Sequence, residues 1–318
     1  MGKTNHPLVS VPVITYNSSK TIVETLDSIY NQTYPNIELI VSDDCSTDNT
    51  VEICQKWISA HNRRFNNIKI IKSPINTGVS ANCNRAEDAC NGEWEKMIAG
   101  DDILFPKCIE TFLKYVGDRV DLPCIFSRVQ CFSAIDGKIV DVPFDYDFFS
   151  LSREQQLNKL VYNGNCIPAP GIFTNIVLMR RLGIRNDERI PFLEDYPKWI
   201  NILNSGYKLE LLDQELVKYR VSCGISTADR SLNFLKSISL TILLYQFPEW
   251  TKRDPSDAIT RLDQHLDQIY GQYYKSLDII NDLFSSDEYR IGKMIKKRFK
   301  IISSLIMRIG NHRKTKVK

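Results

Sequence analysis

Residues 94–102 read WEKMIAGDD, a short apolar run that ends in the paired carboxylates of Asp101 and Asp102. A second pair, Asp43 and Asp44, follows another apolar run earlier in the chain. Adjacent carboxylates repel each other unless a cation or a hydrogen-bond donor neutralises them. For either pair alone, a solvated loop end is the simpler interpretation. Two such pairs after predicted strands indicate a divalent metal and a ligand that the metal helps to bind.

The residues around these pairs predict an α/β fold, because short β-branched runs alternate with amphipathic helical stretches. Thr21 begins the first helix with Glu24 in the spacing of a capping box, and residues 46–48 offer N-caps for the second. Both acidic pairs fall at the carboxyl ends of strands, where open α/β sheets bind their ligands. The predicted strands are 8–15, 37–42, 68–72 and 94–98, and a third helix runs from the 76–80 turn to about residue 90.

The second half of the chain has weaker patterns. Apolar runs at 124–132 and 138–142 flank an Asp136-Gly137 turn and predict a hairpin. Ser152 to Gln155 has capping-box spacing and predicts a helix that ends near residue 163. Beyond residue 229 the composition becomes helical, with helices predicted over 232–245 and 258–284.

Five ordered motifs resemble the nucleotide-sugar domain of family 2 glycosyltransferases, which are inverting enzymes of the GT-A fold. They are the run from Val9 to Asn17, SIYNQTY at 28–34, DDCSTDNT at 43–50, NTGVS at 76–80 and GDD at 100–102. FLEDYPKW at 192–199 resembles the family's Glu-Asp motif, and YR at 219–220 with GIST at 224–227 resembles its late loop.

The resemblance covers residues 8 to about 228 and implies a domain organisation. We expect a GT-A-like mixed sheet flanked by helices over 1–228, in which 1–102 binds the nucleotide sugar. Residues 103–228 would bind the acceptor and carry the catalytic base. The remaining residues, 229–318, are expected to form a helical C-terminal region.

The resemblance also implies roles for the donor-binding residues. Thr15 and Tyr16 belong to the first loop, and the ring of Tyr16 can stack on the nucleobase. Asp44 can accept a hydrogen bond from an imide N–H such as that of uracil, which favours a uridine or thymidine diphosphate donor, although a guanine N–H would also serve. Asp43 is expected to cap its own loop or the following helix.

Asp101 and Asp102 are expected beside the diphosphate, whose departure requires positive charge near its oxygens. Asp102 would hold Mn²⁺ or Mg²⁺, because these ions typically take only one or two protein carboxylates beside substrate oxygens. Asp101 would orient the ribose or the metal shell. Arg220 is the candidate for a second, mobile counter-charge on the leaving group. A surface arginine that closes an ion pair is its simpler interpretation.

Inversion needs one general base for the acceptor hydroxyl. Asp195 is the expected base, at the start of a helix whose apolar face is Trp199, Ile200 and Leu203. The positive end of that helix would keep the carboxylate ionised. Glu194 is the alternative base. On spacing alone, Asp195 would be interpreted as an N-cap.

The resemblance implies an inverting glycosyltransferase that moves a sugar from a nucleoside diphosphate, with UDP favoured, to a glycan or lipid-linked acceptor in bacterial surface-polysaccharide synthesis. The stiff loop 165–171, NCIPAPG, would wall the acceptor pocket. A non-catalytic nucleotide-sugar or glycan-binding module is the alternative. It is suggested by Ala99, where the family's Asp-x-Asp-Asp motif has its first carboxylate, and by Ser222, where the late loop usually has a histidine.

Other classes of chemistry find no support in the sequence. The four histidines are scattered, no C-x-x-C occurs among the nine cysteines, and neither G-x-G-x-x-G nor a P-loop motif is present. A chain of 318 residues that is 43% hydrophobic can bury a large core in one or two domains. No signal peptide and no apolar run of about 18 residues is visible, so the sequence predicts a cytoplasmic protein.

The last thirty residues are strongly basic. Residues 289–318 contain seven lysines and four arginines and no acidic residue, and their apolar residues recur at helical spacing. A basic amphipathic helix is typical of peripheral binding to an anionic membrane surface. Nucleic acid is the competing partner, which we do not expect, and a tail packed on the protein itself is the simplest interpretation.

Overall fold

The fold is that of a computed structural model, which describes residues 6–221 and 232–281. Within these ranges nine strands form one mixed sheet in the order β3-β2-β1-β4-β8-β7-β9-β6, with β5 also paired to β1. The strands are β1 Val9–Thr15, β2 Ile37–Asp43, β3 Asn67–Lys72, β4 Trp94–Glu95, β5 Ile98–Ala99, β6 Ile103–Leu104, β7 Cys124–Ser133, β8 Ile172–Asn175 and β9 Leu211–Val221. The mixed sheet flanked by helices confirms the predicted fold class.

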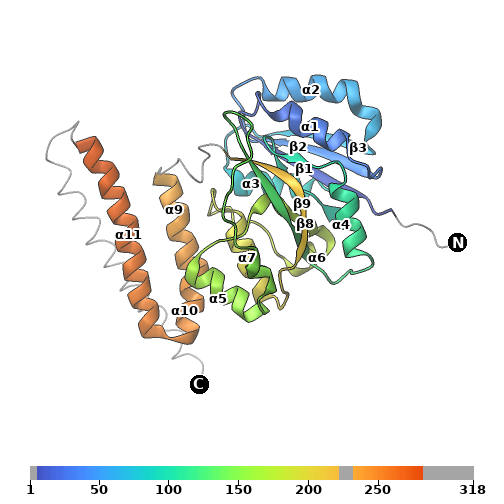
Figure 1. The fold of residues 1–318 in the computed structure, drawn as a ribbon. Coiled ribbons are helices and arrows are strands. Elements are labelled where there is room, and N and C mark those ends of the chain that lie inside the picture. The colour runs from blue at the N-terminus through green and yellow to red at the C-terminus, as the bar shows by residue number, and fades with distance from the viewer. Residues whose placement is uncertain (1–5, 222–231, 282–318) are drawn as a thin grey trace. The chain divides into compact units, whose positions relative to one another are not determined.

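The N-terminal half of the sheet is parallel and built from strand–helix units. β1 pairs with β2, with β4 and with β5, and β2 pairs with β3, all in parallel. The connecting helices are α1 Ile22–Tyr30, α2 Thr50–His61 and α3 Val79–Asp88, and α4 Cys108–Val116 follows β6. Parallel strands end at one edge of the sheet, so the loops after β1, β2 and β5 gather there (Figure 1).

Alternating side chains assign the two faces of this half. Val9, Val11 and Val13 are fully buried in the main core with residues of α1, α2 and α4. Ile40 points to the other face, where it packs with Cys90 beyond the end of α3 and with Ile176. In Figure 1, α1 and α2 lie along one side of the sheet and α3 along the other. Both faces are therefore covered, as near-continuous apolar strands require.

The other half of the sheet is mixed. β8 runs antiparallel to β4 and β7, β7 pairs in parallel with β9, and β6 runs antiparallel to β9. This arrangement brings the end of β9 beside the residues that follow β5. The helices here are α5 Arg153–Asn163, α6 Ile176–Leu182 and α7 Asp195–Asn204.

Several predicted element ends are wrong. The predicted strand 94–98 is split into β4 and β5. Between them lies the fully buried Lys96, whose Nζ donates to Met97 O at 3.0 Å and to Pro170 O at 2.7 Å. Thr21 makes no capping bond; its hydroxyl donates to the carbonyl of Gly100 at 2.8 Å instead. The predicted strand 138–142 is reduced to an isolated bridge between Phe132 and Ile139.

The predicted N-terminal caps of α2 and α5 compare differently with the structure. α2 begins at Thr50, whose N–H donates to Oδ1 of Asp48 at 3.0 Å. The side chain of the N-cap residue Asn49 makes no capping hydrogen bond. The capping box of Ser152 and Gln155 at the start of α5 is confirmed, with both reciprocal bonds present.

Helices make up the described C-terminal residues from Leu232 onward. It contains α9 Leu232–Thr241, a π-helical turn over Ile242–Gln246, α10 Phe247–Arg253 and α11 Pro255–Asn281. Gln246 and Trp250 both donate to the carbonyl of Val161, at 3.0 and 2.8 Å. These bonds help to explain why the first compact unit runs to Leu262, beyond the predicted 1–228 segment, with a second unit from Asp263.

Among the described residues, no helix is both long and apolar enough to cross a membrane. The basic segment 289–318 lies outside the described residues, as do Ser222 and residues 224–227.

Candidate active site

The first acidic pair organises the loops after β1 and β2. The Thr15 hydroxyl donates to Oδ1 of Asp43 at 2.9 Å, and the Ser46 N–H donates to Oδ2 at 2.9 Å. Asp43 thus caps its own loop, as predicted. Thr15 is buried, and its hydroxyl serves this carboxylate. The carbonyl of Thr15 also accepts from the Asp44 N–H at 2.9 Å, and the expected contact of Thr15 with the nucleotide stays a prediction.

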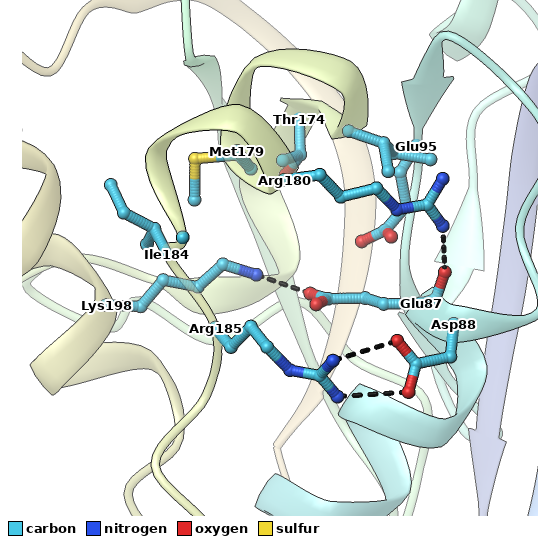
Figure 2. A pocket seen from close by; sticks show the side chains of 11 residues that line it. Glu87, Asp88, Glu95, Thr174, Met179, Arg180, Ile184, Arg185 and Lys198 are labelled. Carbon is cyan, nitrogen blue, oxygen red and sulfur yellow. Dashed lines mark hydrogen bonds and ion pairs between the residues drawn. The ribbon is translucent and has the colours of Figure 1, made fainter.

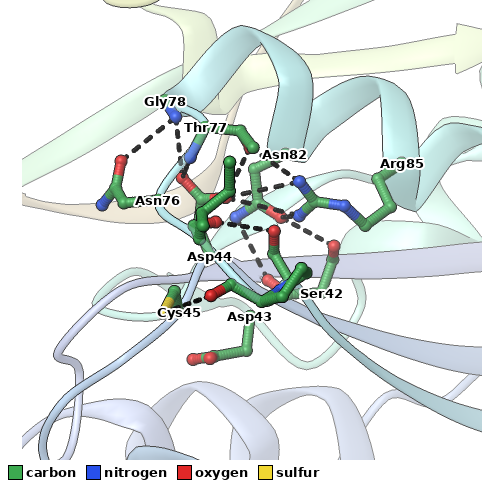
Figure 3. A network of polar contacts seen from close by, with 12 residues as sticks. Ser42, Asp43, Asp44, Cys45, Asn76, Thr77, Gly78, Asn82 and Arg85 are labelled. Atoms are coloured by element: carbon green, nitrogen blue, oxygen red, sulfur yellow. Dashed lines mark hydrogen bonds and ion pairs between the residues drawn. The ribbon is translucent and has the colours of Figure 1, made fainter.

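Asp44 is buried and accepts from the loop before α3 (Figure 3). Oδ2 accepts from the N–H groups of Thr77 and Gly78 at 2.9 and 2.8 Å, and Oδ1 accepts from the Thr77 hydroxyl at 2.6 Å. Arg85 makes a longer contact of 3.4 Å with Oδ1. A carboxylate has about four lone-pair sites. A nucleobase N–H would therefore share or replace the longest contact, that of Arg85.

Tyr16 stands beside these interlocked loops with 46% of its surface exposed. The next residue, Asn17, has a positive φ of 53°, and its N–H donates to the Ser46 hydroxyl at 2.8 Å. Its side-chain oxygen accepts from the Thr47 N–H at 2.8 Å. The tied loops leave the ring of Tyr16 accessible for the stacking that the sequence predicts.

The second acidic pair lies against Arg220, at the end of β9. The Arg220 N–H donates to Oδ1 of Asp102 at 2.9 Å, and its Nε donates to the carbonyl of Asp101 at 2.8 Å. The guanidinium also pairs with Glu24 at 2.6 Å and lies 4.5 Å from the centre of the Phe132 ring. The structure thus brings together Asp101, Asp102 and Arg220. It also shows the arginine engaged in an ion pair.

The pKa values of Asp101 and Asp102 differ from those of carboxyls in a surface loop. Burial and the neighbouring charge of Asp101 raise the pKa of Asp102 well above its usual range. Burial also raises the pKa of Asp101, against the lowering effect of Arg220. A divalent cation would relieve both effects. Across the described residues no group of three or more acidic, histidine or cysteine side chains could hold a metal, so this part of the chain offers an ion at most two such side chains at one place.

The predicted base opens α7, as expected, and Trp199, Ile200 and Leu203 are buried behind it. Oδ1 of Asp195 accepts from the Tyr196 N–H at 2.8 Å. Burial raises the pKa of Asp195, against the lowering effect of its hydrogen bonds with the Asn165 side chain and the Tyr196 N–H. The expectation that the helix end keeps Asp195 ionised stays a prediction.

The adjacent Glu194 is affected in the same way. Burial, followed by the charge of Asp195, raises the pKa of Glu194 to about 7. Glu194 occupies the N-cap position but makes no capping bond with its side chain. Two carboxyl groups in this position therefore hold protons at higher pH than free ones would.

The pair Asp101–Asp102 and the predicted base Asp195 both act on the same tyrosine. Burial raises the pKa of the Tyr219 hydroxyl to about 12, and the negative charges of Asp102, Asp101 and Asp195 raise it further. Tyr219 precedes Arg220 on β9. The last residues of β9 thus connect the predicted diphosphate region with the predicted base.

Buried charged residues that the sequence did not reveal lie on α7, the helix of Asp195, and next to it. Lys198, one turn beyond Glu194, is only 6% exposed and pairs with Glu87 of α3 at 2.5 Å (Figure 2). They line a cavity of about 140 Å³ with the buried Glu95, whose Oε2 has no hydrogen-bond partner. Burial raises the pKa of Glu95 to about 8. The position of Lys198 on the helix of the base was the available signal; Glu87 and Glu95 gave none.

Comparison with known proteins agrees with this geometry. The profile described as Glycosyl transferase family 2 matches residues 10–167. An uncharacterized glycosyltransferase of Haemophilus influenzae is 30% identical over 330 aligned positions, which cover 96% of this chain and 98% of that protein. The Escherichia coli protein WfaP, named as a UDP-Glc:alpha-D-GlcNAc-diphosphoundecaprenol beta-1,3-glucosyltransferase, is 28% identical over 73% of this chain and 87% of its own.

A solved structure supports the fold. Staphylococcus aureus TarS 1–349 in complex with UDP-GlcNAc superposes with a TM-score of 0.60 at 21% identity, over 83% of this chain and 73% of that one. At this identity the likeness concerns the fold alone. With the profile match and the full-length relative, it confirms the resemblance found in the sequence: the chain belongs to glycosyltransferase family 2 and has the GT-A-type fold of that family.

Proposed function

We propose that this glycosyltransferase transfers a sugar with inversion from a UDP donor to a glycan or lipid-linked acceptor of a bacterial surface polysaccharide. The observation that carries the proposal is the contact of Arg220 with Asp101 and Asp102, next to Tyr219, whose pKa is raised by burial and then by charges that include those of both aspartates and of Asp195. The names of relatives support the substrates. WfaP uses UDP-Glc and a diphosphoundecaprenol-linked acceptor by its name, and a 26% identical Bacillus subtilis relative, TuaG, is named for teichuronic acid biosynthesis.

A divalent metal fits the second acidic pair. Asp102, with Asp101 beside it, would hold Mn²⁺ or Mg²⁺, and the raised pKa of both carboxyls is the condition that a cation relieves. Such an ion supplies positive charge to the leaving diphosphate. Arg220 adds a second positive charge if its guanidinium exchanges Glu24 for phosphate oxygens.

Recognition of the base falls to the first loops. The exposed ring of Tyr16 stacks on the nucleobase, and Asp44 accepts from its imide N–H by sharing the site that Arg85 contacts at 3.4 Å. The hydrogen bonds from Thr77 and Gly78 hold the carboxylate in place for this contact.

Asp195 acts as the general base in the transfer, with Glu194 as the alternative. The acceptor hydroxyl gives its proton to the carboxylate while its oxygen forms a bond to the anomeric carbon. The bond from that carbon to the diphosphate breaks on the opposite side, and the electron pair leaves with the phosphate oxygen. One in-line step of this kind inverts the anomeric centre.

The test compares wild type with Asp195→Asn, which keeps the size of the side chain. Release of UDP from UDP-glucose and UDP-GlcNAc with Mn²⁺ should fall by roughly 10² to 10⁴, whereas UDP affinity measured by calorimetry should be unchanged. Glu194→Gln is the parallel variant, and the larger loss identifies the base. A wild-type protein that binds UDP-sugars and metal yet releases no UDP would instead be the binding module.

We also propose that the basic segment 289–318 binds anionic lipid at the cytoplasmic face of the membrane. Its eleven positive side chains each contribute about 1 kcal/mol near such a surface, and salt screens that attraction. Deleting the segment should release the protein from anionic vesicles and leave UDP release intact. Equal sedimentation with anionic and neutral vesicles would contradict the proposal.

A further inference from the structure

The loop at 165–171 contacts the predicted base at one end and the sheet at the other. Asn165 donates from Nδ2 to Oδ2 of Asp195 at 2.7 Å. The carbonyl of Pro170 accepts from the buried Nζ of Lys96 at 2.7 Å, at the break between β4 and β5. The two prolines of the loop restrict its backbone further. Asn165 is therefore presented to Asp195 by an anchored segment.

The orientation of the Asn165 amide is fixed by its second hydrogen bond. Its Oδ1 accepts from the Ile167 N–H at 3.2 Å. Because an N–H can only donate, the oxygen of the amide must face Ile167 and the NH₂ group must face the carboxylate. The asparagine thus donates to Asp195 by structural necessity within this loop.

The two oxygens of Asp195 have different donors. Oδ1 accepts from the backbone N–H of Tyr196, which no substitution at Tyr196 other than proline would remove, and Oδ2 accepts from the Asn165 side chain. A carboxylate that accepts two bonds keeps lone pairs for a further proton. Asn165 is consequently the side-chain donor to Oδ2 that a substitution can remove, while Trp199, whose side chain also lowers the pKa of Asp195, stays in place.

We propose that Asn165 is the positioning residue of the proposed base: its amide fixes the carboxylate rotamer of Asp195 and favours the ionised form that accepts the proton of the acceptor. The inference rests on the assignment of Asp195 made above. Burial raises the pKa of Asp195 and the Asn165 hydrogen bond lowers it, so removing the amide raises that pKa further.

Other titratable groups face Asp195 and stay in place in the test. Glu194 and Lys198 lie on its own helix, Cys166 follows Asn165 in the loop, and Tyr219 lies on β9. The hydroxyl of Tyr196 donates to the carbonyl of Leu160. Since a substitution of Asn165 alters none of these groups directly, a change in the titration of Asp195 reports the lost amide.

Two variants separate the amide from the shape of the loop. Asn165→Ala removes both hydrogen bonds. Asn165→Ser keeps an oxygen for the Ile167 N–H, but its side chain is too short to reach the carboxylate. Asn163→Ala, an exposed change at the end of α5, is the matched control.

The first measurement is the titration of Asp195 by ¹³C NMR of aspartate-labelled protein, with the resonance assigned by its loss in Asp195→Asn. We expect both Asn165 variants to raise the pKa of Asp195 by about one unit, and the control to leave it unchanged. An unchanged pKa in both Asn165 variants overturns the proposal. This measurement does not require turnover.

The second measurement is the pH profile of UDP release from UDP-GlcNAc with Mn²⁺. The acidic limb of kcat should move to higher pH by the same amount in both Asn165 variants, with KM for the donor unchanged. A uniform loss at all pH values would indicate a structural role and overturn the proposal. If Asp195→Asn keeps full activity, the base assignment itself fails, which is distinct from an inactive Asp195→Asn beside an unshifted Asn165→Ala.

Discussion

The two acidic pairs after β2 and β5 look alike in the sequence and differ in chemistry. Asp43 and Asp44 are buried among donors, because hydroxyls and backbone N–H groups of the neighbouring loops meet their oxygens. Asp102 is buried and the adjacent Asp101 is partly buried, and the pKa of each is raised. A carboxylate that the protein satisfies builds a loop. A pair whose charges the protein leaves only partly neutralised is the one for which we propose a cation.

The same contrast extends to the base. Asp195 and Glu194 have a raised pKa although they begin a helix, because burial outweighs the donors that face them. The carboxyls that we propose for proton or metal chemistry thus differ from Asp43 and Asp44, because the protein neutralises their charge only in part. The comparison can be tested at both pairs.

The largest effect is expected at Asp102, the proposed metal ligand. Asp102→Asn removes the charge and keeps the shape, so the Mn²⁺-dependent part of UDP binding should weaken by about 10²-fold or disappear. Calorimetry with UDP, with and without Mn²⁺, measures it. The same metal dependence in wild type and variant would place the metal elsewhere and remove the contrast.

A smaller effect is expected at the satisfied pair. In Asp44→Asn one oxygen becomes an NH₂ group that faces N–H or hydroxyl donors, so the loop at Thr77 and Gly78 should loosen. UDP binding should weaken about tenfold, equally with and without Mn²⁺, and the free energy of unfolding should fall by about 2 kcal/mol. Uridine binding with wild-type affinity would show that Asp44 neither contacts the base nor holds its loop.

The smallest effect concerns stability rather than binding. The pKa of Glu95 is raised from 4.5 to about 8, so its contribution to stability is present below pH 4.5 and is lost as the pH rises to about 8. Glu95→Gln should therefore match wild type at pH 5 and raise Tm by roughly 5 °C at pH 9. Glu93→Gln, an exposed change two residues earlier, is the control. Equal Tm differences at both pH values would mean that Glu95 does not titrate in this range.

The sequence predicted the parallel half of the fold because each strand and helix there carries its own periodicity and the acidic pairs mark the strand ends. It failed at β4–β5, where a buried lysine between the two strands bonds to a loop 74 residues away. It also missed β8, whose four residues, Ile172–Asn175, are too few to show alternation. Interactions between distant segments have no local pattern to reveal them.

The same limit applies to the site. The motifs identified Asp102, Asp195 and Arg220, since these residues occupy positions that the family resemblance marks. The partners that set their chemistry were not identified: Asn165 precedes Asp195 by 30 residues, and Glu24 is separated from Arg220 by 196. Single-sequence reasoning therefore finds the residues of a family motif more readily than the distant residues that bond to them.

The contact between Gly78 and the segment before the base has a consequence for engineering. Gly78 has a φ of +87°, and a Cβ there would lie 2.7 Å from Cβ of Pro191, while the Ser80 hydroxyl donates to the carbonyl of Ile190. The turn that holds Asp44 thus shares a packed surface with the residues that lead to Glu194 and Asp195. An attempt to exchange the nucleotide preference by redesigning that turn would have to redesign residues 190–195 with it.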